Sequence, residues 1–233
     1  VLPGILSENS DLFIPEGVLI YAMDGAVIDM SNFQLENNGH FTIAATASLV
    51  QGSSSNVFGT GKFEVIRKSG SNTSMFNFLS SPINTINVQS VYGGSNVLSF
   101  APADHNNGLN GWSYHTSGTL NNAHGYAVSG SINTGFSGSR YYQGMLNNGS
   151  ISIPLDGATY GSAFDGWNLI GNPYPSAIYM SDFISSNADV GSVTIYNQLL
   201  NSYQTYNVVN ANNIDIASGQ AFYIEFSEAD SGL

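Results

Sequence analysis

The sequence predicts an all-β protein: a short parallel β-helix-like segment of 22-residue rungs over residues 1–70, followed by a β-sandwich or jelly-roll-like domain over residues 71–233. Three observations support this. A glycine-containing pattern recurs every 22 residues near the start of the chain. The rest contains many short apolar runs separated by Asn- and Gly-rich turns. Long amphipathic helical patterns are missing; the only helix predicted is a short one after Pro175, with Ser176 as its N-cap.

The repeat in the first part is marked by three dipeptides: Glu16-Gly17, Asn38-Gly39 and Thr60-Gly61. Aligned on these glycines, Leu19, Phe41 and Phe63 fall at the same position, so the alignment predicts that they stack in one inward-facing column on adjacent parallel strands. A meander of antiparallel hairpins of similar length is the alternative, and it would give the same spacing without the stack.

The second part begins after the polar stretch at residues 69–74, which is the predicted boundary. Ten short strands are predicted beyond it, with turn residues between them at a spacing typical of a sandwich or jelly roll. They cover residues 76–79, 97–100, 111–115, 125–129, 140–146, 150–154, 167–171, 192–196, 203–208 and 220–226.

The most distinctive stretch is residues 166–178, Gly-Trp-Asn-Leu-Ile-Gly-Asn-Pro-Tyr-Pro-Ser-Ala-Ile. Side chains alternate between the two faces of a strand from Trp167 to Gly171, and Pro173 and Pro175 then end that strand. Gly171 has no side chain, so another segment can approach its backbone closely. The stretch contains no nucleophile, base or metal cage. It is predicted to be a structural corner, with Trp167 in the core.

This corner resembles a segment that recurs in large secreted and cell-surface proteins of Bacteroidetes bacteria, usually upstream of a type IX secretion sorting domain. Three further segments match that family: residues 78–82, 146–153 and 217–224. Many members have an aromatic residue before the Ser-Ser-Pro where this chain has Leu79, so we expect different packing there. The resemblance implies an extracellular module of a larger adhesin-like or polysaccharide-active protein, and it implies no catalytic residues.

Composition narrows the possible partners. The net charge is −12 and only Lys62, Arg67, Lys68 and Arg140 are positive, which argues against binding to nucleic acid or to anionic lipid surfaces. There is no Cys, which excludes disulfides and thiol chemistry. No apolar run is long enough for a membrane span, and neither a signal peptide nor an initial Met is present. We therefore expect a piece of a longer exported protein, secreted or at the cell surface, without membrane insertion.

Metal binding is predicted at one place only. Asp104, Asn106 and Asn110 place oxygen-bearing side chains as in the first part of a calcium loop, but the twelfth position is His115 where a bidentate Glu is expected. An Asx-rich turn is the alternative. The histidines lack metal-site spacing and are predicted to make ordinary hydrogen bonds. They are His40, His105, His115 and His124. Apart from possible calcium, no cofactor is expected.

Paired carboxylates could in principle hydrolyse glycosidic bonds. The pairs nearest in sequence are Asp156 with Asp165 and Glu225 with Glu228. Acidic residues on an exported protein are expected to solvate its surface, and a polysaccharide lyase would need a cluster of cations that this chain lacks. The sequence therefore predicts no enzymatic activity.

Aromatic side chains offer a better candidate site. Trp112 and Tyr114 are two residues apart, so on a strand they share a face, whereas Tyr141 and Tyr142 point to opposite faces. The predicted ligand-binding residues are Trp112 and Tyr114, with Tyr141 or Tyr142 beside them if their strands are neighbours. Flat rings can meet the C–H faces of sugars while nearby amides bond their hydroxyls. The alternative is that these rings belong to an ordinary core.

The function predicted from the sequence is a non-catalytic extracellular module for adhesion or recognition, binding polysaccharide or another glycan and joined to other domains of the same chain. The acidic field favours neutral glycans over sulfated or uronate-rich ones. The alternative is a structural spacer or stalk that presents another domain, and a polysaccharide-active enzyme is a third, weaker option.

Overall fold

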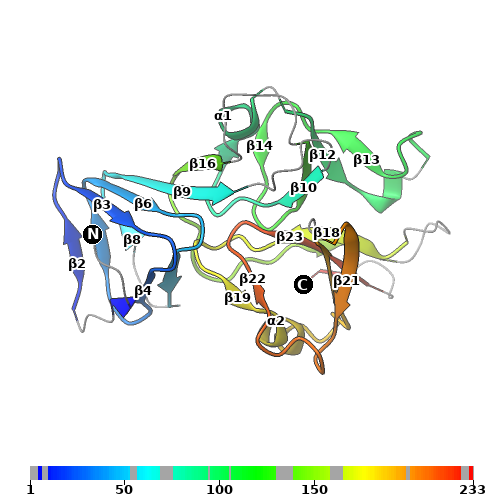
Figure 1. The fold of residues 1–233 in the computed structure, drawn as a ribbon. Helices are drawn as coiled ribbons and strands as arrows, with labels where there is room; N and C mark the ends of the chain where they lie inside the picture. The colour runs from blue at the N-terminus through cyan, green and yellow to red at the C-terminus, as the bar shows by residue number, and fades with distance from the viewer. Residues whose placement is uncertain are drawn as a thin grey trace.

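The computed structural model describes residues 5–6, 10–52, 57–68, 76–93, 95–104, 106–129, 139–157, 165–197, 200–226 and 231–232. In these residues the protein is all-β, with several separate sheets and little helix (Figure 1). The helical elements are α1 (Val88–Tyr92), α2 (Met180–Ser186) and the 3₁₀ turn η1 (Pro102–Asp104). None of these is long and apolar enough to cross a membrane, within the part of the chain that is described.

Three sheets with parallel pairing form the N-terminal unit, residues 5–68, at the left of Figure 1. The first contains β1 (Ile5–Leu6), β4 (Val27–Met30) and β7 (Ser48–Gln51); the second contains β2 (Leu12–Ile14), β5 (Leu35–Asn37) and β8 (Val57–Phe58); the third contains β3 (Leu19–Ala22), β6 (His40–Ile43) and β9 (Lys62–Lys68), with β16 (Ser139–Gly144) antiparallel to β9. Each sheet joins strands from successive passes of the chain, so the parallel pairing predicted from the repeat is confirmed.

The predicted column of three apolar residues is wrong in its first member. Phe41 lies opposite Phe63, with ring centroids 6.1 Å apart, and both are buried. The residue opposite Phe41 on β3 is Ile20, whereas Leu19 lies opposite His40 and is 79% exposed. The first corner takes residues 15–18 and the second only residues 38–39, which moves the register of β3 by one residue and turns Leu19 outward.

Two of the repeated glycines are needed where successive passes of the chain touch. A Cβ atom on Gly39 would overlap the Val18 carbonyl oxygen, and one on Gly61 would overlap the Gly39 carbonyl oxygen. Gly17, in the wider first corner, has open space around it and a φ of 79°, so glycine serves there for its backbone conformation. The same dipeptide pattern thus has two physical causes.

Side chains at the corners link one pass of the chain to the next. The Asp24 carboxylate accepts from the Thr46 N–H at 3.0 Å, and the Asn38 side-chain oxygen accepts from the Thr60 N–H at 3.0 Å. Inside the second corner the fully buried Asn37 donates from its Nδ2 to the Lys62 carbonyl at 3.0 Å. These bonds satisfy backbone groups that the turns would otherwise leave without partners.

Two four-stranded antiparallel sheets make up most of the remainder. The middle sheet runs β10 (Phe76–Leu79), β15 (Tyr126–Ser129), β12 (Val97–Phe100) and β13 (Trp112–Tyr114); the C-terminal sheet runs β18 (Trp167–Gly171), β23 (Ala221–Glu225), β20 (Val193–Asn197) and β21 (Ser202–Tyr206). Three two-stranded ladders complete the structure: β11 (Ile86–Asn87) with β14 (Thr119–Leu120), β17 (Pro154–Leu155) with β24 (Ser231–Gly232), and β19 (Ile178–Tyr179) with β22 (Asp215–Ile216).

Local predictions in this region differ from the structure in several places. Residues 150–153 form no strand, and α1 was not predicted. The helix after Pro175 exists, but it begins at Met180 with Tyr179 at its N-cap and no side-chain cap, so Ser176 does not cap it. The strand β19 takes the residues between the proline turn and the helix, and the Met180 N–H is satisfied by the Ile214 carbonyl.

The buried hydrophobic residues that the structure describes form three clusters. The largest extends from Ile14 in the N-terminal unit to Leu146, passing through the buried face of the middle sheet. The second lies between the C-terminal sheet and α2, and the third lies between the middle and C-terminal sheets. The predicted boundary at residues 69–74 lies outside the described residues, and the largest cluster continues from one side of it to the other.

Candidate functional site: an aromatic cleft

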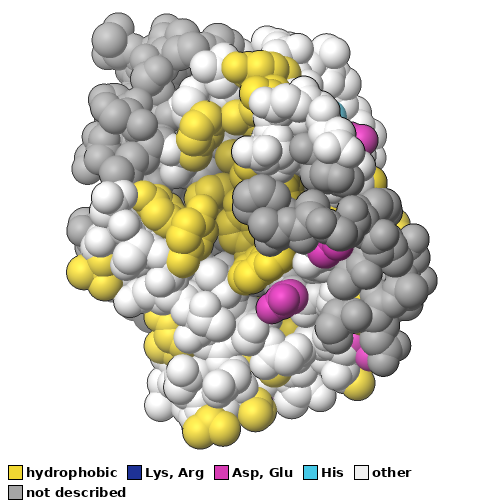
Figure 2. Space-filling model, turned by 90° about the vertical axis from the view of Figure 1, so that its right-hand side faces the viewer, with side chains coloured by type: hydrophobic (Ala, Val, Ile, Leu, Met, Phe, Trp, Pro, Cys, Tyr) yellow, Lys and Arg dark blue, Asp and Glu magenta, His cyan; other side chains and the backbone are white. Residues whose placement is uncertain are grey.

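A cleft of about 460 Å³ opens between the middle and C-terminal sheets. We call it the aromatic cleft. Its lining consists of five aromatic rings and two threonines: Phe100, Trp112, Trp167, Tyr203, Tyr223, Thr194 and Thr205. Strands β13 and β21, which supply Trp112 and Tyr203, are edge strands of their sheets and lie on the right-hand side of Figure 1. Viewed from that side, hydrophobic side chains gather around a hollow (Figure 2).

The two sheets are closest at the end away from these edge strands. The Gly125 N–H donates to the Leu169 carbonyl at 3.0 Å, and the Gly171 N–H donates to the Ala123 carbonyl at 2.8 Å. A Cβ atom on Gly125 would lie 2.6 Å from the Leu169 Cγ, so only glycine permits this approach. Larger side chains fill the space between the sheets elsewhere, and the aromatic cleft lies among them.

One row of cross-strand neighbours forms the C-terminal-sheet side of the cleft. Leu169 pairs with Tyr223, Tyr223 with Thr194, and Thr194 with Thr205, so these four side chains share a face of the sheet. The two threonine hydroxyls are 2.9 Å apart and hydrogen-bonded to each other. This pair is the polar part of an otherwise aromatic lining.

Ring contacts close the inner end of the cleft. Phe78 lies 5.5 Å from Tyr223 and 6.5 Å from Tyr203, and Phe100 lies 6.1 Å from Tyr223, all between ring centroids of opposite sheets. Trp112 packs on Phe100 at 5.0 Å, and among the described residues its ring contacts are with its own sheet only. The inner rings therefore hold one another in place, while the Trp112 ring is half-buried at the opening.

The electrostatics of the cleft are those of a neutral site. No charged side chain among the described residues lines it. Burial raises the pKa of the Tyr223 hydroxyl, and the neighbouring Tyr203 raises it further through charge repulsion and a hydrogen bond. Tyr223 therefore stays protonated at physiological pH, and its hydroxyl is a hydrogen-bonding group and not a charge.

Residues 7–214 match the family model of DUF8693, a domain of unknown function. The chain belongs to the DUF8693 family. No curated protein and no solved structure gives a significant match to this DUF8693 domain.

Two of the aromatic residues predicted for ligand binding lie at or near the cleft of this DUF8693 domain. Trp112 lines it, and Tyr114 is on the same face of β13 and 62% exposed, as the alternation of a strand requires. Tyr114 does not belong to the lining, but its position extends the aromatic face beyond Trp112. Their role in binding stays a prediction.

The other two predicted residues lie elsewhere, because β16 belongs to the third sheet of the N-terminal unit and does not neighbour β13. Tyr142 is fully buried, and its hydroxyl shares a hydrogen bond with the hydroxyl of Tyr92. Burial raises the pKa of Tyr142 to about 12. Its assignment as a ligand-binding residue is therefore corrected: no surface of its ring is open to a glycan.

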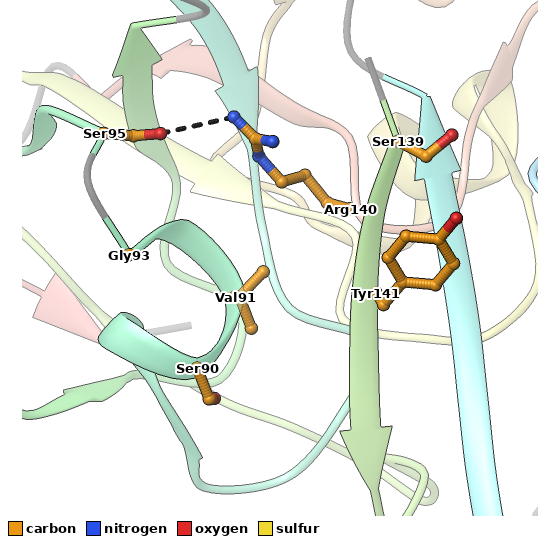
Figure 3. A pocket seen from close by; sticks show the side chains of 7 residues that line it. All are labelled: Ser90, Val91, Gly93, Ser95, Ser139, Arg140 and Tyr141. Carbon is orange, nitrogen blue, oxygen red and sulfur yellow. Dashed lines mark hydrogen bonds between the residues drawn. The ribbon is translucent and has the colours of Figure 1, made fainter. Parts of the chain in front are cut away.

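Tyr141 is 42% exposed and lines a separate hollow of about 80 Å³ between α1 and β16 (Figure 3). Arg140 also lines this hollow and donates from Nη2 to the Ser95 hydroxyl at 3.3 Å. Its guanidinium lies 5.9 Å from the centre of the Tyr92 ring, in cation–π range. The small size of this hollow and its distance in the fold from β13 separate Tyr141 from the aromatic cleft.

Only two of the four cations are exposed. Arg140 and the residue paired with it on β9, Arg67, are both buried. Arg67 donates from Nη1 to three backbone carbonyls, and burial lowers its pKa to about 10, so it remains charged at neutral pH. The exposed cations are Lys62 and Lys68, and the latter is paired with Asp24 at 3.2 Å. Little positive surface is left to attract acidic ligands.

The predicted calcium residues lie in the connection between β12 and β13. Asp104 ends η1, and Asn110 adopts a φ of 53° in the turn that follows. Asn107 organises this turn: its side-chain oxygen accepts from the Leu109 N–H at 2.7 Å, and its Nδ2 donates to the Trp112 carbonyl at 2.7 Å. The turn is thus held by an Asx-type arrangement, and it places Trp112 at the start of β13. Calcium binding by Asp104, Asn106 and Asn110 stays a prediction.

The histidines and carboxylates do not converge in the described part of the chain. No group of three or more His, Asp or Glu side chains is placed to hold a metal ion there. His115 bonds to the Thr119 carbonyl at 3.0 Å, and burial lowers the pKa of His124. His105 and Glu228 lie outside the described residues, and Glu225 is the cross-strand neighbour of Trp167 without lining the cleft.

Sequence reasoning missed four aromatic residues of the cleft: Phe100, Trp167, Tyr203 and Tyr223. Trp167 was assigned to the core, and it is half-buried, packing on Tyr223 at 6.1 Å while also lining the cleft. The alternation of Tyr203 with Thr205 on β21 was the available indication of an aromatic and hydroxyl face. Nothing in the sequence indicated that this face meets Trp112.

Proposed function

We propose that this DUF8693 domain is a non-catalytic, extracellular recognition module that binds neutral polysaccharide in the aromatic cleft. The observation that carries the proposal is the composition of the lining in the described part of the chain: five aromatic rings, a hydrogen-bonded pair of hydroxyls and no charged side chain. The size of the cleft, about 460 Å³, falls within the usual range for small-ligand sites, roughly 300–1,000 Å³.

The chemistry of neutral sugars fits such a lining. A pyranose ring presents C–H groups on its faces and hydroxyls around its edge. Aromatic rings bury the C–H groups, and the hydroxyls of Thr194 and Thr205 can each donate or accept one bond beyond the one that they share. A phosphate, sulfate or carboxylate group would find no cation in the lining and an overall charge of −12 around it.

The proposed location is argued from the sequence, and the proposed architecture from the pairing of the strands. The resemblance to exported Bacteroidetes proteins supports a secreted or cell-surface position, and the lack of Cys and low cation content are compatible with it. We further propose that the N-terminal unit is a short parallel β-helix and that the middle and C-terminal sheets form a sandwich. The matched register of successive strands in the three parallel sheets supports the β-helix.

Affinity gel electrophoresis tests the proposal. The protein is run through gels containing neutral polysaccharides (hydroxyethyl cellulose, arabinoxylan, galactomannan, dextran) or acidic ones (alginate, polygalacturonate, carrageenan). We expect retardation by at least one neutral polymer and by none of the acidic ones. The Trp112→Ala variant should no longer be retarded by that polymer. The Tyr179→Ala variant should still be retarded, because Tyr179 is 63% exposed but lies outside the aromatic cleft.

Two results would contradict the proposal. One is that no polysaccharide retards the native protein; the other is that Trp112→Ala and the native protein are retarded equally. In the first case the domain is better explained as a structural spacer, for which the continuous core between the N-terminal unit and the middle sheet is well suited. In the second case the glycan binds at another face.

A further inference from the structure

Aromatic side chains reach the cleft from both sheets. Phe100 and Trp112 come from the middle sheet, whereas Trp167, Tyr203 and Tyr223 come from the C-terminal sheet. The contact between Phe100 and Tyr223, at 6.1 Å, shows that these two sets face each other. A flat occupant of the cleft is therefore bounded by aromatic surface on both sides.

The side-chain hydroxyls of the lining all come from the C-terminal sheet. The hydroxyls of Thr194 and Thr205 lie beside each other on β20 and β21, and those of Tyr203 and Tyr223 lie on the adjacent positions of β21 and β23. Among the described residues, the middle-sheet side of the lining consists of Phe100 and Trp112, and its one side-chain hydrogen-bonding group is the indole N–H at the edge of the Trp112 ring. A hydroxyl that points at the face of either ring loses its hydrogen bonds to water and gains none from that face.

Pyranoses differ in how many of their faces are apolar. When all ring substituents are equatorial, as in β-linked glucose or xylose chains, the axial positions on both faces carry hydrogen. An axial hydroxyl at C2 (manno configuration) or at C4 (galacto configuration) makes one face polar. A site with aromatic rings on both sides penalises such a hydroxyl, because burying it without a partner is costly.

We propose that the aromatic cleft selects β-linked pyranose chains whose ring substituents are all equatorial over chains with an axial hydroxyl. This inference rests on the proposed function and narrows it to gluco- and xylo-configured glycans. Trp112 and Tyr203, one from each sheet, determine the selectivity, because they are the cleft rings on the two edge strands. The threonine pair bonds hydroxyls at the ring edge and contributes affinity without distinguishing the two configurations.

Isothermal titration calorimetry with matched hexasaccharides tests the inference. Cellohexaose and β-1,4-mannohexaose have the same linkage and length and differ only in the configuration at C2. We expect the native protein to bind cellohexaose about tenfold or more tightly than mannohexaose, the ratio expected for one unsatisfied hydroxyl. Tyr203→Ala should bring the ratio toward one. Tyr203 is 57% exposed, so this variant should fold even if Trp112→Ala does not.

Each outcome separates the inference from the proposed function. Equal binding of the two hexasaccharides, or tighter binding of mannohexaose, overturns the selectivity and leaves neutral-glycan binding intact. The selectivity is also overturned if neither hexasaccharide binds but galactomannan or dextran retards the protein in gels. If no hexasaccharide and no polysaccharide binds, the proposed function fails and the inference with it. Thr205→Val should weaken the binding of both hexasaccharides by a similar factor. If it changes the ratio of the two affinities, the hydroxyls and not the rings discriminate between the sugars.

Discussion

Gly171 and Ser80 are in direct contact: a Cβ atom on Gly171 would overlap the Cβ of Ser80. Ser80 donates its backbone N–H to the Gly219 carbonyl at 2.8 Å, and Asn172 accepts from the Gly219 N–H at 3.1 Å. The Nδ2 of Asn147 donates to the carbonyls of Ser81 and Pro173. The four segments that carry the resemblance to Bacteroidetes proteins thus meet at one junction, and the junction holds the C-terminal sheet against the rest of the molecule.

Gly171→Ala should destabilise the protein by about 1–3 kcal/mol or more, because the added methyl group overpacks the junction. Urea unfolding measures the change. Gly191→Ala is a matched control, since nothing lies within 4 Å of a Cβ atom there and its φ is not in the left-handed region. Combining Gly171→Ala with Ser80→Gly should recover part of the loss. If the double variant is no more stable than Gly171→Ala alone, the contact with Ser80 is not the cause.

Phe41→Ala should cost about 3–5 kcal/mol, because Phe41 is fully buried against Phe63 in the N-terminal unit. Leu19→Ala should change stability by no more than about 0.5 kcal/mol, since Leu19 is 79% exposed. Chemical denaturation of the two variants tests the register. If the two variants lose comparable amounts of stability, the sequence-based alignment, in which Leu19 is buried in a stack with Phe41 and Phe63, would be correct after all.

Asp24 should contribute a small, pH-dependent stability. The Thr46 N–H lowers the pKa of its carboxyl most, with smaller contributions from Lys68 and the Thr46 hydroxyl. Because the pKa is lower folded than unfolded, the contribution is complete above the unfolded pKa of about 3.9 and is lost as pH falls through the folded pKa. The side chain is 52% exposed, so the effect should stay below about 1 kcal/mol.

Denaturation between pH 7 and pH 2 measures this contribution against Asp24→Asn, whose stability difference from the native protein should shrink as the pH falls. Lys68→Met should preserve most of the pH dependence, because the backbone bond to Thr46 is the largest cause of the shift. A Lys68→Met protein that behaves like Asp24→Asn would show that the ion pair dominates.

Added calcium should leave the melting temperature of the protein unchanged, because the Asp104–Asn110 turn is held without an ion. Asn107 already satisfies the turn with bonds of 2.7 Å to the Leu109 N–H and the Trp112 carbonyl, so no ion is needed to hold it. Thermal melts in a chelator and in millimolar calcium test this through the linkage between binding and stability. A rise in Tm with calcium that disappears in Asp104→Asn would establish the calcium site instead.

The sequence predicted the parallel pairing of the strands in the N-terminal unit but not their register. The pairing could be predicted because Gly39 and Gly61 are required wherever successive passes touch, and that requirement repeats with the structure. The register could not be predicted, because the first corner uses Gly17 for its backbone conformation and takes more residues than the second. Leu19 and Tyr142 were misplaced for related reasons: period-2 alternation shows that faces differ, but tertiary contacts decide which face is buried.

The aromatic cleft could be predicted only at Trp112. The sequence predicted that Trp112 binds a ligand, with an ordinary core as the alternative, and the structure places its half-buried ring in the lining of the cleft. Trp167, Tyr203 and Tyr223 come from three strands of another sheet, and no local pattern shows that this sheet packs against β13. The corner after Trp167 was correctly predicted to end a strand at the prolines. The Trp167 side chain, predicted to belong to the core, both packs on Tyr223 and lines the cleft.

Tryptophan fluorescence tests the central claim most directly, because the chain has two tryptophans and both line the aromatic cleft. The emission is recorded while hydroxyethyl cellulose, arabinoxylan, galactomannan and dextran are each titrated into the protein, with Tyr203→Ala in parallel. We predict that at least one neutral polysaccharide shifts the emission to shorter wavelength with saturation, and that Tyr203→Ala moves the midpoint of the shift to a higher polysaccharide concentration. If a polysaccharide retards the protein in gels but none changes the emission, binding occurs away from Trp112 and Trp167 and the claim is contradicted.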